Sequence, residues 1–579
     1  MLKITVNGQI LDLEPQMALS IEQFSPLFQE EIAAESYSYP IDIPASDRNK
    51  NILGFLDMPE SATTFEDVDC ELSIDNETRR GTLSVLKANE KRYTCSIFTG
   101  LWRQDVMEMT LPQLDLGGVR VVGDMFDHAQ TTITGTADTF DYVFFPFHNP
   151  NFYNSGPLKY IINDGYFAAG VWNFQRNSDD FPDVNSLVPF VYAQYILKRI
   201  SLTFNLALSG NYFNDDELKT LVVDGNFALD KFEEHVITVD GNDFNVTVNV
   251  CQDRLNLANH VPPISVRQFL QALAYITNSA ITIKDGALNI NLRKDIAAVT
   301  EEEDWTSIAE PYPSVEPVFK TDEKGYEFSM QPDSADKMYE DLSTTNALMS
   351  DTIGNDYLYV DDLPNPGAKG ETHFVRHIHT WWRDLYGNNQ WVQTDWFGYN
   401  PNLKTASAKL KNIPIQADTA MMIKYYANEH AFGVYPELEN KDIMPMVKRL
   451  GNSAEGASGN AFGLRFLFYR GMQPNAIPEW DYPLGSSNVY NALSEKIGNY
   501  ALTLGGEFGI YNSFYKSWVE RLLNGKAVAY IVGLTPQQLT KLNLFTRKRV
   551  GNISFFIQQI SFTVDQQGHK KALVRGVKL

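Results

Sequence analysis

The sequence predicts an α+β fold that is rich in β-structure and divided into several domains. Two small β-barrel or β-sandwich domains are expected, with mixed α/β domains between them. Short runs of alternating apolar and polar residues near the N-terminus indicate strands, and residues 262–292 combine helical spacing with a hairpin pattern. With 579 residues, 44% of them hydrophobic, the chain can bury several cores. Its length alone favours about three to five domains.

Residues 1–115 are expected to form an N-terminal β-barrel-like domain. Ile4 and Val6 alternate with polar residues and lead into Asn7-Gly8, a strong signal for a two-residue hairpin turn. Further alternating pairs follow at regular spacing, which is typical of small barrels and sandwiches.

A segment with two prolines interrupts these strands. Pro40 and Pro44 restrict residues 36–44 to an edge strand or an extended arm, because proline cannot donate a ladder hydrogen bond. An extended arm is a surface that a neighbouring subunit can bind. The candidate interface residues here are Tyr37, Tyr39, Pro40 and Pro44.

Residues 116–300 are expected to form a mixed α/β domain. A helix is predicted from Val188 to Phe204, and the helix-hairpin module 262–292 closes the region. Ser265 and Gln268 match a capping box, after which apolar residues recur on one helical face. Asp285-Gly286 supplies the hairpin turn. The module carries no nucleophile, metal cluster or phosphate loop, so we expect it to build a surface.

Three further segments complete the expected organisation. Residues 301–346 begin with an acidic run and contain four prolines, which favours a linker or edge segment. Residues 347–480 are rich in aromatic residues, glycine and asparagine and indicate a second β-rich domain. Residues 481–579 are expected to form a C-terminal α+β domain.

The charge distribution argues against wrapping nucleic acid. The formal net charge is −24, and duplex DNA binds proteins that replace its counterions with Lys and Arg. The end from Thr540 differs, with eight Lys and Arg against one acid, Asp565. Its run Arg547, Lys548 and Arg549 fits either a solvated strand face or docking onto an acidic partner or neighbouring subunit.

Motifs of catalysis and cofactor binding are absent from the sequence. Gly525-Lys526 lacks the rest of a phosphate-binding loop, and Gly456-Ala457-Ser458-Gly459-Asn460 departs from a nucleophile elbow at its last position. No pair of carboxylates is singled out. We therefore predict no catalytic residue, no cofactor and no enzymatic activity.

Histidines and tryptophans cluster between residues 373 and 396. His377 and His379 would share a strand face with His373 nearby, but no carboxylate or cysteine stands at ligand spacing. A polar, aromatic β face is therefore preferred to a metal site, and no metal is predicted. The tryptophans could stack on sugar rings, or fill a core or subunit interface. The candidate sugar-facing residues are Trp381, Trp382, Trp391 and Trp396.

The N-terminus enters a strand directly, and no apolar run approaches the length of a membrane span of about 18 residues. We expect synthesis in a cytoplasm and no membrane insertion. The three cysteines lack metal-type spacing and are expected to be buried small hydrophobes.

Several stretches together resemble the baseplate hub, or tail-tip, proteins of phages and prophages of Bacteroidetes-type bacteria. The resemblance touches most of the chain and is carried by short patterns. They are residues 37–44 with Asn49 and 52–55, residues 187–190, 226–230, 263–266, 464–471, and 509–518.

This resemblance implies a hub of two related β-barrel domains and intervening α/β domains in the virion tail. Such a ring adapts the tail tube to the tip or spike and leaves a channel for DNA. It implies a closed homo-oligomer, with a trimer favoured over a hexamer. The implied partners are other tail proteins, namely tube or distal tail, tape measure, and spike or fibre proteins. An acidic surface could line the channel without binding nucleic acid stably.

Three other functions compete with the hub. One is a carbohydrate-binding or receptor-binding tail protein or adhesin, which the tryptophans favour. Another is a distal tail adaptor ring. The third is a cell-wall hydrolase, which rests only on unassigned carboxylates and histidines.

Overall fold

The computed structural model divides the chain into two compact units. Unit 1 comprises Met1–Gln104, Asn278–Thr321 and Ser517–Leu579, and unit 2 comprises Asp105–Thr277 and Asp322–Lys516. The structure describes residues 2–29, 36–74, 77–99, 107–149, 151–152, 161–169, 171–176, 187–239, 242–284, 286–318, 323–330, 333–336, 373–383, 389–400, 409–424, 442–447, 449–452, 461–474, 481–503, 507–540, 542–565, 568–569 and 571–578.

The predicted fold class is confirmed: the chain is α+β, rich in strands and built of more than one compact unit. Each unit draws on segments that are far apart in the sequence. The five linear domains therefore remain a prediction.

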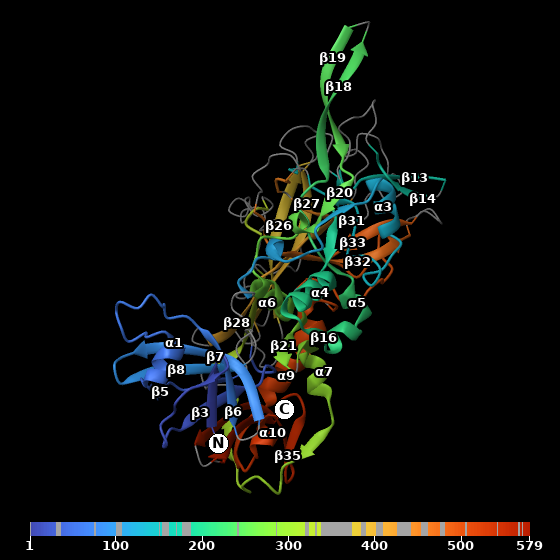
Figure 1. The fold of residues 1–579 in the computed structure, drawn as a ribbon. Helices are drawn as coiled ribbons and strands as arrows, with labels where there is room; N and C mark the ends of the chain where they lie inside the picture. The colour runs from blue at the N-terminus through green and yellow to red at the C-terminus, as the bar shows by residue number, and fades with distance from the viewer. Residues whose placement is uncertain are drawn as a thin grey trace. The chain divides into compact units, whose positions relative to one another are not determined.

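Unit 1 contains a fifteen-stranded sheet that joins the two ends of the chain. Strand β3 (Leu19–Phe24) pairs antiparallel with β36 (Ile553–Asp565), with Leu19 opposite Val564. Figure 1 shows the blue N-terminal strands beside the red C-terminal ones. The main path of the sheet also contains β2 (Gln9–Ile10), β1 (Leu2–Val6), β6 (Val68–Ile74), β7 (Glu77–Ala88), β8 (Arg92–Thr99), β4 (Ser36–Ser38), β38 (Ala572–Lys578), β34 (Lys526–Val532) and β24 (Ser314–Pro317).

One hydrophobic core lies under this sheet and takes residues from all three segments of unit 1. In β1, Leu2, Ile4 and Val6 are buried while Lys3 is exposed, the alternation of a sheet with one covered face. Trp305 and Val574 belong to the same core, so the middle and the end of the chain pack with the beginning.

The short elements of unit 1 follow local signals. The predicted hairpin at Asn7-Gly8 is confirmed: both residues have positive φ, and Val6 pairs with Gln9. Helix α10 (Pro536–Thr540) begins after Thr535, whose hydroxyl accepts a hydrogen bond from the Gln538 N–H. The other elements are β5 (Ile41–Pro44), α1 (Asp47–Leu53), the hairpin of β21 (Ser279–Lys284) and β22 (Ala287–Leu292), α7 (Arg293–Ala298), β23 (Glu302–Asp304), β35 (Arg547–Val550) and β37 (Gly568–His569).

Unit 2 is organised around a six-stranded sheet. Its order is β10 (Tyr142–Val143), β15 (Phe190–Tyr192), β17 (Leu221–Val223), β32 (Arg465–Gln473) and β29 (Asp418–Thr419), with β33 (Tyr482–Ser486) also pairing with β32. Helix α4 (Ala193–Phe204) starts later than the predicted Val188, because residues 190–192 pair with strands on both sides.

Helix α6 (Val266–Thr277) confirms the predicted capping box. The Gln268 side chain accepts a hydrogen bond from the Ser265 N–H, and the Ser265 hydroxyl accepts one from the Gln268 N–H. Phe269 and Leu273 are fully buried. The ring of Phe269 lies 6.1 Å from that of Phe466 in β32, so the helix packs on the central sheet.

Two-stranded ribbons make up much of the rest of unit 2. In Figure 1 the ribbon of β18 (Asp230–Val239) and β19 (Asn242–Cys251) extends away from the remainder of this unit. The other elements are η1 (Leu111–Gln113), β9 (Val119–Val121), α3 (Met125–Thr132), β11 (Phe147–His148), β12 (Ile161–Ile162), β13 (Gly165–Ala168), β14 (Val171–Phe174), β16 (Ala207–Ser209), η2 (Asn211–Asn214), α5 (Asp216–Lys219), β20 (Arg254–Asn256), η3 (Leu257–His260), β25 (Glu323–Met330), β26 (His373–Arg383), β27 (Asn389–Asn400), β28 (Lys409–Ile415), β30 (Met421–Lys424), β31 (Asp442–Met446) and the π-helix η8 (Tyr511–Tyr515). Helix α9 (Lys516–Asn524) begins at the last residue of unit 2 and continues into unit 1.

Within the described part of the chain, no helix is both long and apolar enough to cross a membrane.

Candidate functional site

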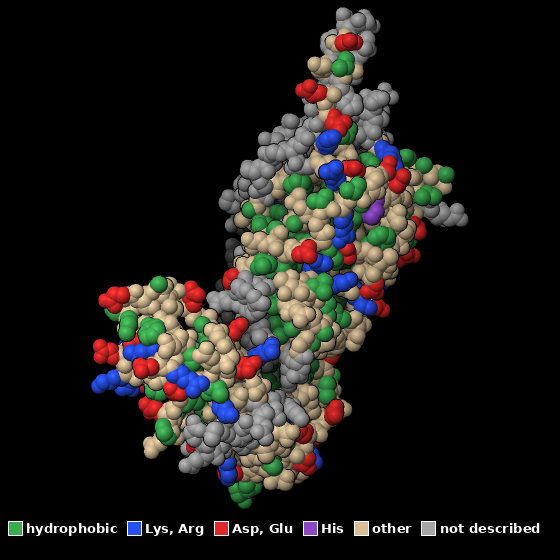
Figure 2. All heavy atoms as spheres, viewed as in Figure 1, with side chains coloured by type: hydrophobic (Ala, Val, Ile, Leu, Met, Phe, Trp, Pro, Cys, Tyr) green, Lys and Arg blue, Asp and Glu red, His purple; other side chains and the backbone are tan. Residues whose placement is uncertain are grey.

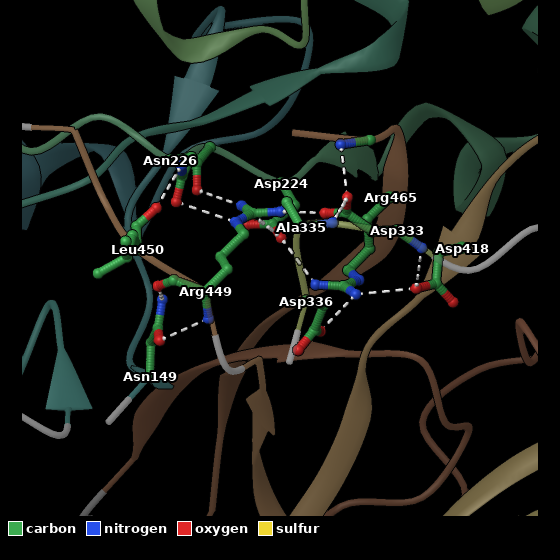
Figure 3. A network of polar contacts seen from close by, with 12 residues as sticks. Asn149, Asp224, Asn226, Asp333, Ala335, Asp336, Asp418, Arg449, Leu450 and Arg465 are labelled. Atoms are coloured by element: carbon green, nitrogen blue, oxygen red, sulfur yellow. Dashed lines mark hydrogen bonds and ion pairs between the residues drawn. The ribbon is translucent and has the colours of Figure 1, made fainter. Parts of the chain in front are cut away.

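The densest arrangement of charged side chains in the described parts of unit 2 is buried beside the six-stranded sheet. It contains four aspartates and two arginines, which we call the Asp–Arg cluster: Asp224, Asp333, Asp336, Asp418, Arg449 and Arg465. Each side chain is only 1 or 2% exposed. Figure 3 shows how the two guanidinium groups lie among the carboxylates.

Arg449 connects three segments that are distant in the sequence. Its Nη2 lies 2.9 Å from Asp224 Oδ2, and its Nη1 donates to Asp333 Oδ2 at 3.1 Å. Its Nε donates to Asn226 Oδ1 at 2.9 Å, and Nη2 also donates to the Gly225 carbonyl at 3.0 Å. The guanidinium therefore has a partner for each of its three nitrogens.

The backbone of Arg449 is also hydrogen-bonded to distant segments. The Asn149 amide donates to the Arg449 carbonyl at 3.0 Å and accepts from the Arg449 N–H at 3.2 Å. Asn226 donates to the Leu450 carbonyl at 2.9 Å. These contacts fix the position from which the side chain reaches the aspartates.

Arg465 is the first residue of the central strand β32. Its Nη2 donates to Asp336 Oδ2 at 2.7 Å and to Asp418 Oδ2 at 2.8 Å, while its Nη1 lies 3.5 Å from Asp224 Oδ2. A backbone hydrogen bond brings Asp224 next to Arg465, because the Asp224 N–H donates to the Arg465 carbonyl at 3.0 Å. Arg465 thus joins β32 to the short segment 333–336.

Gly225 allows the chain to pass close to the backbone of Pro189. A Cβ at this position would lie 2.6 Å from the Pro189 carbonyl oxygen, so a larger residue would displace the neighbouring backbone. The residues on either side of it, Asp224 and Asn226, both contact Arg449.

The carboxylates of the cluster differ in their electrostatics. Burial raises the pKa of Asp224 and of Asp418 above the usual range, against the opposing effect of the arginines. Burial also disfavours the charged form of Asp333, but Arg449, Arg465 and two backbone N–H groups outweigh it and hold its pKa below the usual range. Such separation of pKa values occurs in catalytic sites and in structural ion-pair networks alike.

Burial decides what this arrangement can do. Side chains that are 1 or 2% exposed offer no surface to a substrate, and every guanidinium contact described above is to another part of the chain. The cluster therefore acts as an internal cross-link between segments. Across the described residues, no group of three or more His, Cys, Asp or Glu side chains is arranged to hold a metal ion.

A second buried pair ties another part of unit 2. Arg470 Nη1 lies 2.5 Å from Glu217 Oε1, and Arg470 also donates to the carbonyls of Asn488 and Tyr500. Glu217 in turn accepts hydrogen bonds from the N–H groups of Asn499 and Tyr500. In this pair the single carboxylate of Glu217 balances the single guanidinium charge of Arg470.

The predicted basic run lies in unit 1, in strand β35. The parallel ladder places Glu302, Glu303 and Asp304 of β23 opposite Arg547, Lys548 and Arg549, respectively. Lys548 is buried and pairs with Glu303, with its Nζ 5.2 Å from the ring centre of Trp305. Arg549 Nη2 lies 2.6 Å from Asp304, and Arg547 donates to the Ala297 carbonyl at 3.0 Å. We call these six residues the acid–base ladder; an interface role for its basic run remains a prediction.

The proline-bounded segment 36–44 lies against its own sheet. Strand β4 pairs with β3 and β8, and β5 pairs with β8. Tyr39 is 49% exposed, and its hydroxyl donates to Glu22 at 2.8 Å. Pro40 is exposed and Pro44 is half-buried at the end of β5, whereas the Tyr37 side chain lies outside the described residues. Their role in an interface stays a prediction.

The predicted aromatic cluster lies in β26 and β27. These strands form an antiparallel pair in which Trp381 is opposite Trp391 and Trp382 is opposite Gln390. Trp396 lies in β27, and His373, His377 and His379 lie in β26. The side chains of all seven residues fall outside the described ones, so the sugar-facing hypothesis stays a prediction.

The Asp–Arg cluster was not predicted from the sequence. A signal for two of its members exists: Asp224 follows Leu221-Val222-Val223, and Arg465 stands within Leu464 to Phe468. A single charge in an apolar strand run indicates a buried and paired charge. Asp333 and Asp336 carry no such signal, because polar residues surround them. Asp418 and Arg449 do stand near apolar residues, but a second polar residue is adjacent to each, Thr419 and Lys448, so neither is a single charge in an apolar run.

Comparisons with known proteins give no family for this chain. No family model and no curated protein matches it. Among solved structures, the 43 kDa tail protein of prophage MuSo2 from Shewanella oneidensis aligns with a TM-score of 0.31 and 10% identity over 100% of this chain and 98% of that chain. The tail protein from Neisseria meningitidis MC58 aligns with a TM-score of 0.31 and 9% identity over 100% and 95%. A TM-score of 0.31 supports no argument about fold or function.

Proposed function

We propose that this protein is a structural component of a phage tail, a baseplate hub or tail-tip ring. In this role it joins the tail tube to the tip or spike and leaves a channel for DNA. The ring is a homo-oligomer, with a trimer favoured and a hexamer as the other option. It is made in the bacterial host cytoplasm and ends in the virion tail.

The observation that carries the proposal concerns the residues that resemble hub proteins. Several of them hold the framework of unit 2 together. Asn226 binds the Arg449 side chain, Arg465 pairs with three aspartates, and Val266 is buried in helix α6. The residues that resemble hub proteins thus include several that cross-link or fill the core of unit 2. We expect this if the two kinds of protein share a structural role.

The distribution of charge agrees with this role. On the face drawn in Figure 2, acidic and basic side chains are interspersed among the described residues. The net charge of −24 would let DNA slide through a lumen without lasting contact.

Imaging of the purified protein tests the proposal directly. We expect single-particle classes of a closed ring around a lumen, with a mass of three copies by light scattering. A monomer that stays monomeric when mixed with the tube, tape measure and spike proteins of the same phage would overturn the ring.

Charge reversal tests the basic run separately. In the acid–base ladder, Arg547 and Arg549 changed to Glu would impair assembly or partner attachment. Lys548 is left unchanged, because it is buried and pairs with Glu303, so its reversal would disturb the fold. The matched control changes Arg80 and Arg92 to Glu, two exposed residues of unit 1 outside the ladder. Wild-type protein should not retain duplex DNA at physiological salt. Tight, steeply salt-dependent binding that the double change abolishes would instead assign a nucleic-acid site to this end.

The distal tail adaptor ring and the carbohydrate-binding tail protein are the competing assignments. Binding to the tube protein at one ring face and to the spike at the other favours the hub, whereas attachment to the tube alone favours the distal adaptor. Retention on a glycan array, lost when Trp381 and Trp391 are changed to Ala, would favour carbohydrate binding.

A further inference from the structure

The Asp–Arg cluster contains more carboxyl groups than guanidinium groups. Four aspartates surround two arginines, and all six side chains are almost completely buried. If every carboxyl group were ionised, the cluster would bury two negative charges that no cation among the described residues compensates. Burying an unpaired charge is costly, and such a group commonly takes up a proton instead.

Asp333 and Asp418 each have hydrogen-bond donors on both carboxyl oxygens. Asp333 Oδ1 accepts from the N–H groups of Ala335 and Gly463 at 3.0 and 2.9 Å, and its Oδ2 accepts from Arg449. Asp418 Oδ1 accepts from the Thr419 N–H at 2.8 Å, and its Oδ2 accepts from the Asp333 N–H and from Arg465. Such donors favour the charged form of each carboxylate.

Only one of the two carboxyl oxygens of Asp224 is contacted by hydrogen-bond donors of the described residues. Its Oδ2 lies 2.9 Å from Arg449 and 3.5 Å from Arg465, but its buried Oδ1 has no hydrogen-bond partner among the described residues. Asp336 accepts from the same Arg465 nitrogen as Asp418. Asp224 is therefore the aspartate of the cluster that has a buried oxygen without a described donor, and its other oxygen lies between the two arginines.

We propose that the Asp–Arg cluster is a proton-binding site and that Asp224 carries the proton on Oδ1 at neutral pH. A neutral Asp224 still accepts at Oδ2 from the guanidinium groups. The excess of negative charge among the described residues of the cluster falls from two to one.

Electrostatics within the site point in the same direction. Burial raises the pKa of Asp224, and Asp333 and Asp336 raise it further, while Arg449 and Arg465 oppose them. Burial likewise raises the pKa of Asp418. The three donors on Asp418 leave Asp224 as the residue that holds the proton most readily.

The site links the ionisation of one residue to the anchoring of a chain segment. Asp333 and Asp336 attach residues 333–336 to the arginines that also contact Asp224. A group whose pKa is raised on folding stabilises the fold below its unfolded pKa, and this contribution is lost as pH rises through the folded pKa. Loss of the Asp224 proton at alkaline pH would therefore weaken this anchor.

Replacement of Asp224 by Asn tests the proposal, because asparagine is a neutral group of the same shape. The unfolded Asp224 carboxyl group ionises near its usual pKa, whereas the folded one keeps its proton up to the raised pKa, so wild type loses stability between these two values. We therefore expect Asp224→Asn to gain stability relative to wild type in urea unfolding from pH 5 upward, by up to about tenfold in the unfolding equilibrium constant per pH unit. Above the folded pKa the difference between the two proteins should become constant. Because the quantity is a difference between two proteins, other titrating groups cancel.

Two variants provide matched controls. Asp333→Asn removes a fully hydrogen-bonded carboxylate of the same cluster, and Glu217→Gln removes the carboxylate of the one-to-one pair with Arg470. Both should lose stability at pH 6 and gain none relative to wild type as pH rises to 9. If Asp224→Asn behaves as they do, Asp224 is ionised and the proposal is wrong.

A spectroscopic measurement keeps the proposal testable if a variant fails to fold. Infrared spectra of the wild-type protein at pH 7 should contain the C=O stretch of a buried protonated carboxyl group. This band should disappear as pH rises and be missing from Asp224→Asn. Its absence from the wild-type protein at neutral pH would overturn the proposal.

Discussion

The Asp–Arg cluster of unit 2 and the acid–base ladder of unit 1 both join distant segments through charges, but in opposite ways. In the ladder, three acids face three bases in strand register; the outer pair, Asp304 and Arg549, is 52 and 41% exposed, and only the central Lys548 is buried. In the cluster, four acids meet two bases at 1 or 2% exposure. Exposed pairs contribute little to stability, whereas a buried charge that loses its partner is strongly destabilising. The burial of the charges, rather than their number, therefore decides how much each charged pair contributes to the stability of the fold.

The largest effect is expected where a new charge has no partner at all. Leu273→Asp would bury a carboxylate under helix α6, at a side chain with no exposure. We expect no soluble, cooperatively folding protein, and the same for Phe269→Asp, because each would cost several kcal/mol. Circular dichroism and urea unfolding of the soluble fraction check this. Leu202→Asp, at an exposed position of helix α4, is the control and should fold.

The next largest effect is expected from removing one arginine of the cluster. Arg449→Met keeps much of the volume but leaves Asp224 and Asp333 without their shared partner. The free energy of unfolding should fall by about 3–5 kcal/mol. Arg176→Met, which removes an exposed partner of Asp124 and Asp127, should change it by less than about 1 kcal/mol. Equal losses in the two variants would refute the contrast drawn between buried and exposed pairs.

The third prediction concerns His260, a buried histidine that lacks a charged partner among the described residues. His260 is fully buried, and this burial lowers its pKa to about 3. The unfolded chain therefore binds a proton below the usual histidine pKa while the folded protein does not, so stability falls as pH falls through this window. We expect a loss of about 2 kcal/mol between pH 6.5 and 5 that His260→Phe removes. An unchanged slope in the variant would assign the acid sensitivity to other groups.

The smallest effect on stability is expected from the exposed outer pair of the ladder, Asp304 and Arg549. Arg549→Gln removes the partner of Asp304, which can be solvated where it lies. The change in unfolding free energy should be close to experimental error, and smaller still in high salt. A loss comparable to that of Arg449→Met would show that the ladder, too, holds the fold.

Local signals in the sequence predicted local structure well. The Asn7-Gly8 turn and the capping box of Ser265 and Gln268 are where they were expected, because each depends on residues that are neighbours in the chain. The start of the helix predicted from Val188 was wrong. Residues 190–192 pair with β10 and β17 instead, and a helical apolar pattern cannot reveal such pairing.

Predictions about sites failed where partners are far apart. The acidic run after residue 300 and the basic run after residue 546 were each recognised, but not as the two sides of one ladder. The cluster escaped notice because its six members come from five separate segments. Asp224 directly follows an apolar strand run and Arg465 lies within one, which marks these two as buried, but the sequence does not show which charges pair with them.

The sequence by itself determined the β-rich α+β class, the turns, the helix caps and the acidic charge of the chain. Each of these is fixed by composition or by contacts between near neighbours. Tertiary structure alone decided that β3 pairs with β36, that three segments share one core, and that four aspartates meet two arginines. The reason is physical: strand pairing and buried charge depend on which distant segments exclude water together, and one-dimensional spacing does not encode that choice.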